Sequence, residues 1–172
     1  MLAASSSVDL TTASTFVNEH LPERVIALPE SSWGSGGNHF TWLNPDTEWM
    51  WPIIHGAESR METLAAEFPD ASGRQASILD QAARELLLLQ SSDWPFLVTT
   101  GQAREYATQR FNEHVDRFNM MAEMAERNGD HSPEDIQMLD ALEERDNPFP
   151  TIDYRVFAAR QGQAGITATP VP

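Results

Sequence analysis

Two tryptophans flank a glycine-rich segment near the start of the chain, and they are the first candidates for contacting a ligand. Residues 29–42 read PESSWGSGGNHFTW, with Trp33 before the glycines and Trp42 at the end. Glycine allows a tight turn or a close approach to another molecule, and an indole offers a broad flat face with one N–H donor. This loop therefore suits one wall of a site for a flat ligand such as a sugar ring. On composition alone, plugging the space between loops is the simpler role for Trp33, Trp42 and Trp94.

Asp93 is the carboxylate with the most distinctive surroundings. It lies in SSDWPF, residues 91–96, at a predicted break between helices and next to an aromatic residue. There it fits two roles equally well: accepting hydrogen bonds from sugar hydroxyls, or capping the start of a turn. The remaining carboxylates offer no reason to prefer one pair as a general acid and base. The sequence also has no GxSxG elbow, phosphate-binding glycine loop or cysteine, so we name no catalytic residue.

The evidence for a metal site is weak. His55 and Glu58 are three positions apart on a predicted helix, a spacing that metal ligands sometimes use, but no second matching pair accompanies them. The charged cluster at residues 112–117 is interpreted as a solvent-exposed helix face with local ion pairs. We therefore expect neither a metal nor a cofactor.

Composition excludes several classes of partner. The chain has 172 residues, about one domain, with 26 acidic residues against 11 basic ones and a net charge of −15. Such a surface repels nucleic-acid phosphates and anionic membranes, whereas a neutral carbohydrate polymer escapes this repulsion. The acidity also fits a protein kept soluble in a salty cytoplasm. No apolar stretch approaches the ~20 residues of a membrane span, and MLAASSSVDL does not resemble a signal peptide, so we expect a cytoplasmic protein.

The spacing of apolar residues predicts a mainly α fold: a bundle of about four main helices after an irregular aromatic and glycine-rich loop. The 44–68 helix would begin at the cap residue Asn44, with Pro52 distorting its first turns or delaying its start. The next helix is apolar nearly all round, which predicts a buried central element, and Trp49 and Trp51 are assigned to packing. The predicted helices span residues 44–68, 74–91, 102–128 and 133–145.

Two shorter segments are predicted to be non-helical. Residues 25–28, Val-Ile-Ala-Leu before Pro29, suggest a short strand or a buried loop. Residues 91–96 are expected to be irregular, because Pro95 disfavours a helical conformation at Trp94.

Three blocks of sequence resemble the C-terminal helical domain of glycoside hydrolase family 57 glucan branching enzymes. The resemblance runs from about residue 10 to residue 160, and its most specific parts are the WGxGG turn with the tryptophan that follows it and the block ELLLLQSSDWPF. The blocks read LPESSWGSGGNHFTWLNPDTEW, AARELLLLQSSDWPFLVTTGQAREYATQRFNEHVDRF and ERDNPFPTIDYRVFAAR.

The resemblance implies that catalysis and glucan binding are divided between two domains. In that family an N-terminal incomplete (β/α) barrel carries a glutamate nucleophile and an aspartate acid/base, which transfer an α-1,4 glucan to a 6-hydroxyl. The matched region follows this barrel and contains neither motif, so the chain is expected to be inactive by itself. The resemblance implies that Trp33 and Trp42 contact the glucan and, more weakly, that Asp93 lies near the cleft. The implied partners are an α-glucan and a separate or missing catalytic barrel.

The same resemblance suggests how the chain is divided. Residues 1–28 would be a lead-in or a remnant of the barrel, with residues 25–28 as an orphaned strand. Residues 29–160 would form the helical domain, and residues 161–172 a flexible tail.

Two other hypotheses stay open. The chain could be a structural or protein-interaction domain whose aromatic loops form a partner interface, or an independent metalloenzyme. Some apolar surface would normally face the barrel, so we expect the chain to self-associate whether it is a branching-enzyme domain or a protein-interaction domain.

Overall fold

The computed structural model describes residues 8–21 and 23–158 and divides the chain into two units, Met1–Ser32 and Trp33–Pro172. In the described part of the first unit, the helix α1 (Ala13–Glu19) follows Thr12, whose hydroxyl caps it by accepting a hydrogen bond from the backbone N–H of Thr15 at 3.2 Å. This helix buries none of its side chains.

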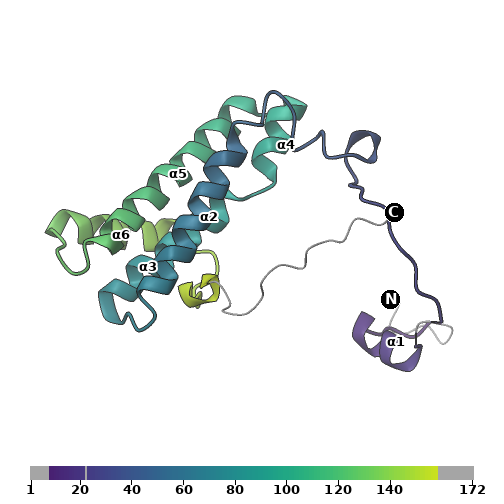
Figure 1. The fold of residues 1–172 in the computed structure, drawn as a ribbon, viewed down its shortest axis with the longest axis horizontal. Helices are drawn as coiled ribbons and strands as arrows, with labels where there is room; N and C mark the ends of the chain where they lie inside the picture. Colours follow the sequence, from purple (N-terminus) through teal and green to yellow (C-terminus); the bar gives the residue numbers. More distant parts are fainter. Residues whose placement is uncertain (1–7, 22, 159–172) are drawn as a thin grey trace. The chain divides into compact units, whose positions relative to one another are not determined.

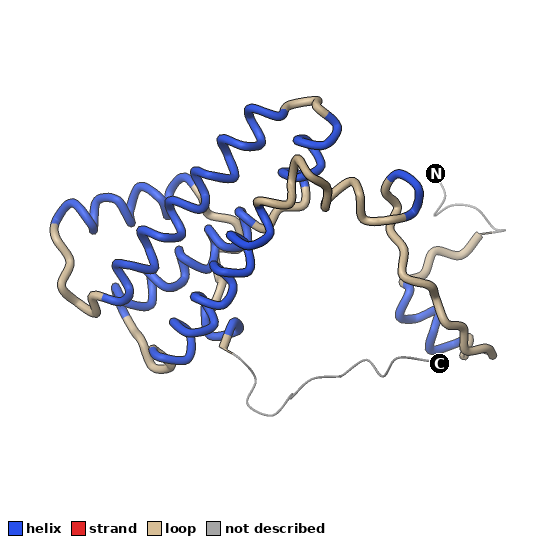
Figure 2. Tube along the Cα trace, turned by 45° about the horizontal axis from the view of Figure 1, so that its top comes forward, coloured by secondary structure: helices blue, strands red, loops and turns tan. Residues whose placement is uncertain are grey.

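The second unit is a helical bundle (Figure 1). Figure 2 shows helices joined by loops, and no strand occurs in the described ranges. Within those ranges no helix has both the length and the apolar character needed to cross a lipid bilayer. The mainly α prediction is confirmed. The elements are η2 (Ser35–Gly37), α2 (Met50–Glu67), α3 (Gly73–Leu89), α4 (Asp93–Thr100), α5 (Arg104–Glu126), α6 (Pro133–Arg145) and η3 (Tyr154–Phe157).

Helix α3 is the central element, as its apolar sequence predicts. It packs against α2, α5, α6 and η3, and Figure 1 shows α2, α3 and α5 running alongside one another. Burying its leucine and isoleucine side chains removes apolar surface from water, which is the main force that stabilises the bundle. The largest fully buried side chains of the core include Met61, Leu64, Ile78, Leu79, Leu86, Phe111, Phe118 and Met121.

Residues 25–28 form neither the predicted strand nor a buried loop. They have no regular structure, and the side chains of Val25, Ile26 and Leu28 are all exposed. A strand needs a neighbour that pairs with its backbone groups, and the described residues contain no strand to act as one. The apolar run therefore remains on the surface.

The segment predicted to be irregular around Pro95 is instead the start of α4. Pro95 is the third residue of this helix, where the backbone N–H has no acceptor within the helix and its absence costs no hydrogen bond. Pro52 holds the same position in α2, which begins at Met50 and not at Asn44. Pro52 thus delays the helix start, one of the two outcomes predicted for it.

The segment after α6 is fastened back onto the turn between α2 and α3. Tyr154 is completely buried, and its backbone N–H donates to the carboxylate of Asp80 at 3.0 Å. Burial raises the pKa of Asp80 above its ordinary value. The guanidinium of Arg155 donates to the carbonyl oxygens of Pro69 and Ala71, at 2.8 and 2.6 Å. These bonds fasten residues 154 and 155 to α3 and to the turn between α2 and α3.

Two glycines provide a matched test of backbone conformation. A Cβ added at Gly56 or at Gly101 would meet no other atom within 4 Å, but Gly101 ends α4 with φ +70° whereas Gly56 lies inside α2. We expect Gly101→Ala to lower the free energy of unfolding by about 1 kcal/mol, because L residues are strained at positive φ. Gly56→Ala should raise it by about 0.5–1 kcal/mol, because alanine favours a helix interior. Urea unfolding followed by circular dichroism measures both; the same sign for both changes would contradict the assigned backbone conformations.

Candidate ligand-binding groove

The three residues singled out from the sequence line one cavity. Trp33, Trp42 and Asp93 enclose, with Ser92 and Phe96, a space of about 140 Å³. The side chain of Trp33 is 77% exposed. Its ring nevertheless has support, because it meets Trp42 edge-on at 5.0 Å and lies 5.8 Å from the ring of Phe96. The structure thus places a supported indole face at the surface.

The backbone at Trp42 is held by two hydrogen bonds to its carbonyl oxygen. The hydroxyl of Thr47 donates at 2.9 Å and the indole N–H of Trp51 donates at 3.1 Å. Asn44, two residues further on, donates from its amide group to the hydroxyl of Thr99 on α4 at 2.8 Å. The loop that carries Trp42 is therefore anchored to both α2 and α4.

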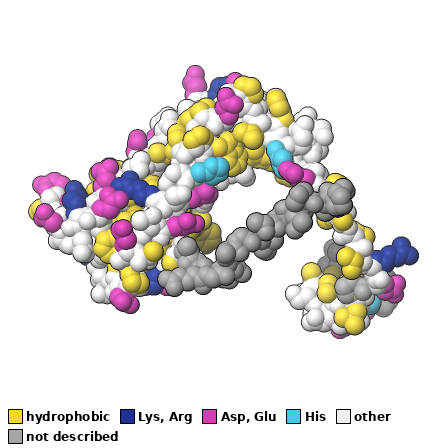
Figure 3. All heavy atoms as spheres, in the orientation of Figure 1, with side chains coloured by type: hydrophobic (Ala, Val, Ile, Leu, Met, Phe, Trp, Pro, Cys, Tyr) yellow, Lys and Arg dark blue, Asp and Glu magenta, His cyan; other side chains and the backbone are white. Residues whose placement is uncertain are grey.

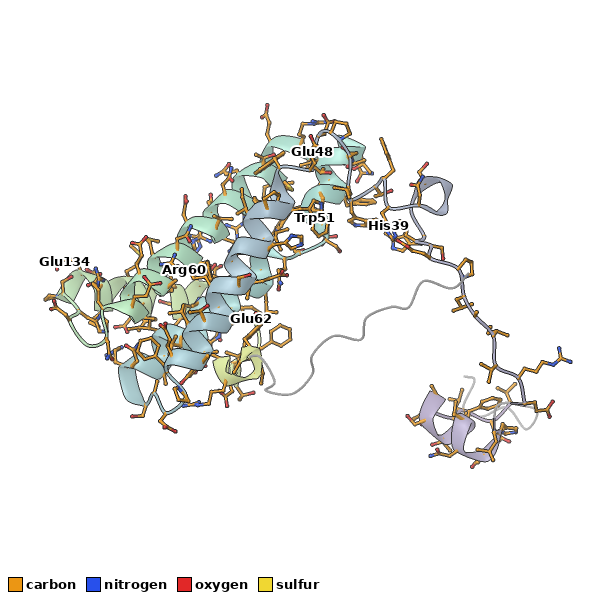
Figure 4. The ribbon with its side chains drawn as sticks, in the orientation of Figure 1. His39, Glu48, Trp51, Arg60, Glu62 and Glu134 are labelled. Carbon is orange, nitrogen blue, oxygen red and sulfur yellow. The ribbon has the colours of Figure 1, made fainter. Side chains whose placement is uncertain are left out.

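A larger cavity of about 610 Å³ shares Trp42 and Ser92 with the first. Trp51 and His55, one turn apart on α2, lie on it with their ring centroids 6.0 Å apart. Figure 4 labels Trp51 on α2 and His39 on the preceding loop, and Figure 3 shows hydrophobic side chains gathered over this part of the bundle. Trp51, assigned from the sequence to packing, does pack against the core, but it also lines this cavity. The cavity lining consists of His39, Trp42, Leu43, Trp51, His55 and Ser92.

A third cavity of about 200 Å³ contains the polar pair Glu58 and Gln90, and Trp42 and Trp51 line it as well. The side-chain amide of Gln90 donates to a carboxylate oxygen of Glu58 at 2.6 Å. Trp42 and Ser92 line all three cavities, and we call the three together the aromatic groove. His55 and Glu58, which the sequence suggested as a metal pair, line different cavities.

Asp93 lies both at a helix start and beside a cavity, the positions that its two predicted roles require. Its side chain is exposed and lines the cavity beside Trp33. It is also the first residue of α4, where a negative charge interacts favourably with the helix N-terminus. The residue before the helix, Ser92, makes no side-chain cap hydrogen bond, and the exposed carboxylate of Asp93 is a hydrogen-bond acceptor.

Trp94, on α4, packs against α3 and α5. It lines none of the three cavities. Its indole N–H donates to the carbonyl oxygen of Leu88 at 2.8 Å, and its ring stacks on His114 of α5 at 6.2 Å. These contacts set the position of α4, which contributes Asp93 and Phe96 to the groove.

A buried ion network joins α3 to α5. Nδ1 of His114 lies 2.7 Å from a carboxylate oxygen of Glu85, and Nε2 lies 3.0 Å from the guanidinium of Arg110. A guanidinium can only donate, so Nε2 accepts and the ring proton lies on Nδ1, facing Glu85. Arg117 donates to the carboxylate of Asp146 at 3.0 Å.

The prediction of a solvent-exposed face at residues 112–117 is wrong for two of its members. His114 is 1% exposed and Arg117 is 8% exposed, because their partners lie on α3 and just after α6. Glu113 of the same cluster is partly exposed. The hydrogen bond from Gln109 and the guanidinium groups of Arg110 and Arg117 lower the pKa of Glu113 below its ordinary value.

The network also contains the one group of possible metal ligands found in the described ranges. Glu85, His114 and Asp146 offer ligand atoms within 4.8 Å of one another. Arg110 and Arg117, however, already donate to His114 and Asp146 and bring positive charge to the cluster. We therefore assign the cluster as an ion-pair network.

Comparison with known proteins assigns the chain to a family. Residues 53–157 match the family described as 1,4-alpha-glucan branching enzyme, C-terminal. The chain belongs to this family of branching-enzyme C-terminal domains. Asp93, Glu58 and Gln90 lie within the matched residues, whereas Trp33 and Trp42 precede them.

Two relatives extend the match toward the N-terminus. The chain is 44% identical over 143 residues to a 1,4-alpha-glucan branching enzyme from Thermococcus kodakarensis, covering 83% of this chain and 21% of the relative. The solved structure of that same family 57 enzyme, in complex with glucose and additives, matches with 39% identity and a TM-score of 0.78, over 89% of this chain and 28% of that one. A solved branching enzyme of family 57 from Pyrococcus horikoshii is 42% identical with a TM-score of 0.78, over 91% of this chain and 30% of that one. The chain thus spans less than a third of each relative.

The buried network predicts a large difference between two acidic residues. We expect Asp146→Ala to lower the free energy of unfolding by about 1.5–3 kcal/mol, because it removes the buried partner of Arg117 and leaves only the partly exposed Glu113 at 3.0 Å. Asp140→Ala removes an exposed pair with Arg74 and should cost less than about 1 kcal/mol. Urea unfolding of both variants at neutral pH makes the comparison. Equal effects would show that the Arg117–Asp146 pair is not protected from solvent.

Proposed function

We propose that the aromatic groove binds α-glucan as one wall of the substrate site of a family 57 branching enzyme. The observation that carries this proposal is the exposed indole of Trp33, supported by Trp42 and placed beside the carboxylate of Asp93. The carbon-bound hydrogens of a glucose ring form an apolar face that stacks on an indole, and its hydroxyls point outward toward groups such as Asp93. The groove offers both kinds of contact in one place.

Two further facts support a neutral saccharide as the ligand. The chain carries a net charge of −15, which disfavours anionic ligands but not an uncharged glucan. A relative with a TM-score of 0.78 was solved in complex with glucose. Bond cleavage and transfer are assigned to the catalytic barrel of such an enzyme, and the groove of this domain holds and orients the chain.

The barrel is also the proposed partner of the first unit. Leu21, Val25, Ile26 and Leu28 all expose apolar side chains there. Exposed apolar surface of this kind marks an interaction site. We propose that this segment packs on the catalytic barrel, as the family resemblance suggests.

Saccharide titration tests the proposed ligand. Addition of maltoheptaose should quench the tryptophan fluorescence of the chain, because the sugar covers exposed indoles. Trp33→Ala and Trp42→Ala should each weaken binding by about tenfold, which corresponds to ~1.4 kcal/mol. Trp33→Ala is the cleaner variant because the side chain is mostly exposed and its loss leaves the core intact.

Trp49→Phe serves as the matched control. Trp49 is partly exposed but packs on Phe111 and lines none of the three cavities, so its loss should change the affinity by less than about twofold. A folded chain that shows no response to any maltooligosaccharide would count against glucan binding. It would favour the alternative of an aromatic protein-interaction surface.

Without a partner covering it, the apolar segment of the first unit should make the chain self-associate. We expect sedimentation velocity to show a concentration-dependent increase in mass. The double variant Ile26→Ser and Leu28→Ser should reduce it, because less apolar surface is then exposed to water. A strictly monomeric wild-type chain would contradict this expectation.

A further inference from the structure

We infer that the Trp42–Trp51 side of the aromatic groove is a second glucosyl-binding platform, with Glu58 and Gln90 as its polar end. This inference rests on the proposed function, since it concerns how the same glucan continues beyond the cavity of Trp33 and Asp93. It assigns ligand contacts to Trp51, Glu58 and Gln90.

The platform has a rigid aromatic floor. The indole N–H of Trp51 donates to the carbonyl oxygen of Trp42 at 3.1 Å, so the two residues are tied together. Trp51 is partly buried and packs against the core, which leaves it little rotational freedom. Both tryptophans line the 610 Å³ cavity and the smaller 200 Å³ cavity, and the volume of the first falls in the range of small-molecule sites.

The polar end of the platform comes from two different helices. Glu58 lies on α2 and Gln90 directly follows α3, and their side chains meet in a hydrogen bond of 2.6 Å. This bond uses one carboxylate oxygen of Glu58 and the amide nitrogen of Gln90. The second carboxylate oxygen and the amide oxygen are acceptors that suit the hydroxyls of a sugar whose ring lies on Trp51.

Continuity with the first cavity identifies the occupant as the same glucan. Trp42 and Ser92 line both the cavity of Trp33 and the platform, so a bound chain meets both without leaving the groove. Linked contacts of this kind strengthen binding more for a long ligand than for a short one, because the second contact forms within one complex.

The length of the saccharide therefore tests the platform. We expect the wild-type chain to bind maltoheptaose at least about fivefold more tightly than maltotriose. Glu58→Gln and Gln90→Ala should each reduce this ratio to about twofold or less by weakening the binding of maltoheptaose. Glu62→Gln is the matched control, since Glu62 lies one turn further along α2, is exposed and lines none of the three cavities (Figure 4); it should preserve the wild-type ratio.

A measurement on the wild-type chain does not depend on how the variants fold. In a proton–nitrogen correlation spectrum the five tryptophans give separate indole signals, and Trp51→Phe identifies that of Trp51. Maltoheptaose should shift this signal, while the signal of Trp49 stays in place. An unmoved Trp51 signal at saturating maltoheptaose overturns the platform.

The outcomes separate this inference from the proposed function. If maltotriose binds and Trp33→Ala weakens binding by about tenfold, but the length ratio is the same in Glu58→Gln, Gln90→Ala and wild type, only the platform is overturned. If the wild-type chain binds neither saccharide, both the platform and glucan binding by the groove are overturned.

Discussion

The hydrogen-bonded pairing of buried polar groups between α3 and α5 is the constraint on which the rest of the bundle depends. Glu85 and His114 are almost completely buried, and a buried polar or charged group is tolerated only when it is hydrogen-bonded. Their 2.7 Å contact forms at a single register of the two helices. Arg117 extends the same requirement to Asp146 and so to the segment after α6. Because Trp94 stacks on His114, the position of α4 follows from the network too.

The aromatic groove depends in turn on this arrangement. Its ring at Trp42 is carried by a loop, and loops are usually the more mobile parts of a protein. Here Thr47 and Trp51 both donate to the carbonyl oxygen of Trp42, and Asn44 joins the loop to Thr99 of α4. Fixing the loop before a ligand arrives lowers the entropy lost on binding. The buried network therefore helps to position the aromatic groove, because α4 contacts both His114 and the loop that carries Trp42.

Local patterns in the sequence were sufficient to predict the long helices. They were not sufficient to predict contacts between segments that lie far apart in the sequence. The bounds of α6 were predicted correctly because Ser132 and Pro133 are local start signals, and the structure shows the full capping box with Asp135. The start of α4 was missed because proline is tolerated in the first turn of a helix but also ends or breaks helices. His114 and Arg117 were assigned to the surface because periodicity treats charged residues as exposed, and their buried partners lie 29 positions away.

In the candidate site, too, local sequence patterns predicted some residues and missed those that meet from distant segments. The composition of the loop suggested a flat ligand for Trp33 and Trp42, but only the family resemblance grouped Asp93 with them. No local signal pairs Glu58 with Gln90, since they are 32 positions apart and meet only because the middle of α2 packs near the end of α3. Their proximity helps to explain which class of ligand we expect the groove to prefer. The carboxylates of Asp93 and Glu58 can accept hydrogen bonds from hydroxyls but would repel a phosphate or carboxylate on a ligand. The local charges and the acidity of the whole chain therefore favour the same class of ligand, one that is flat, rich in hydroxyls and uncharged.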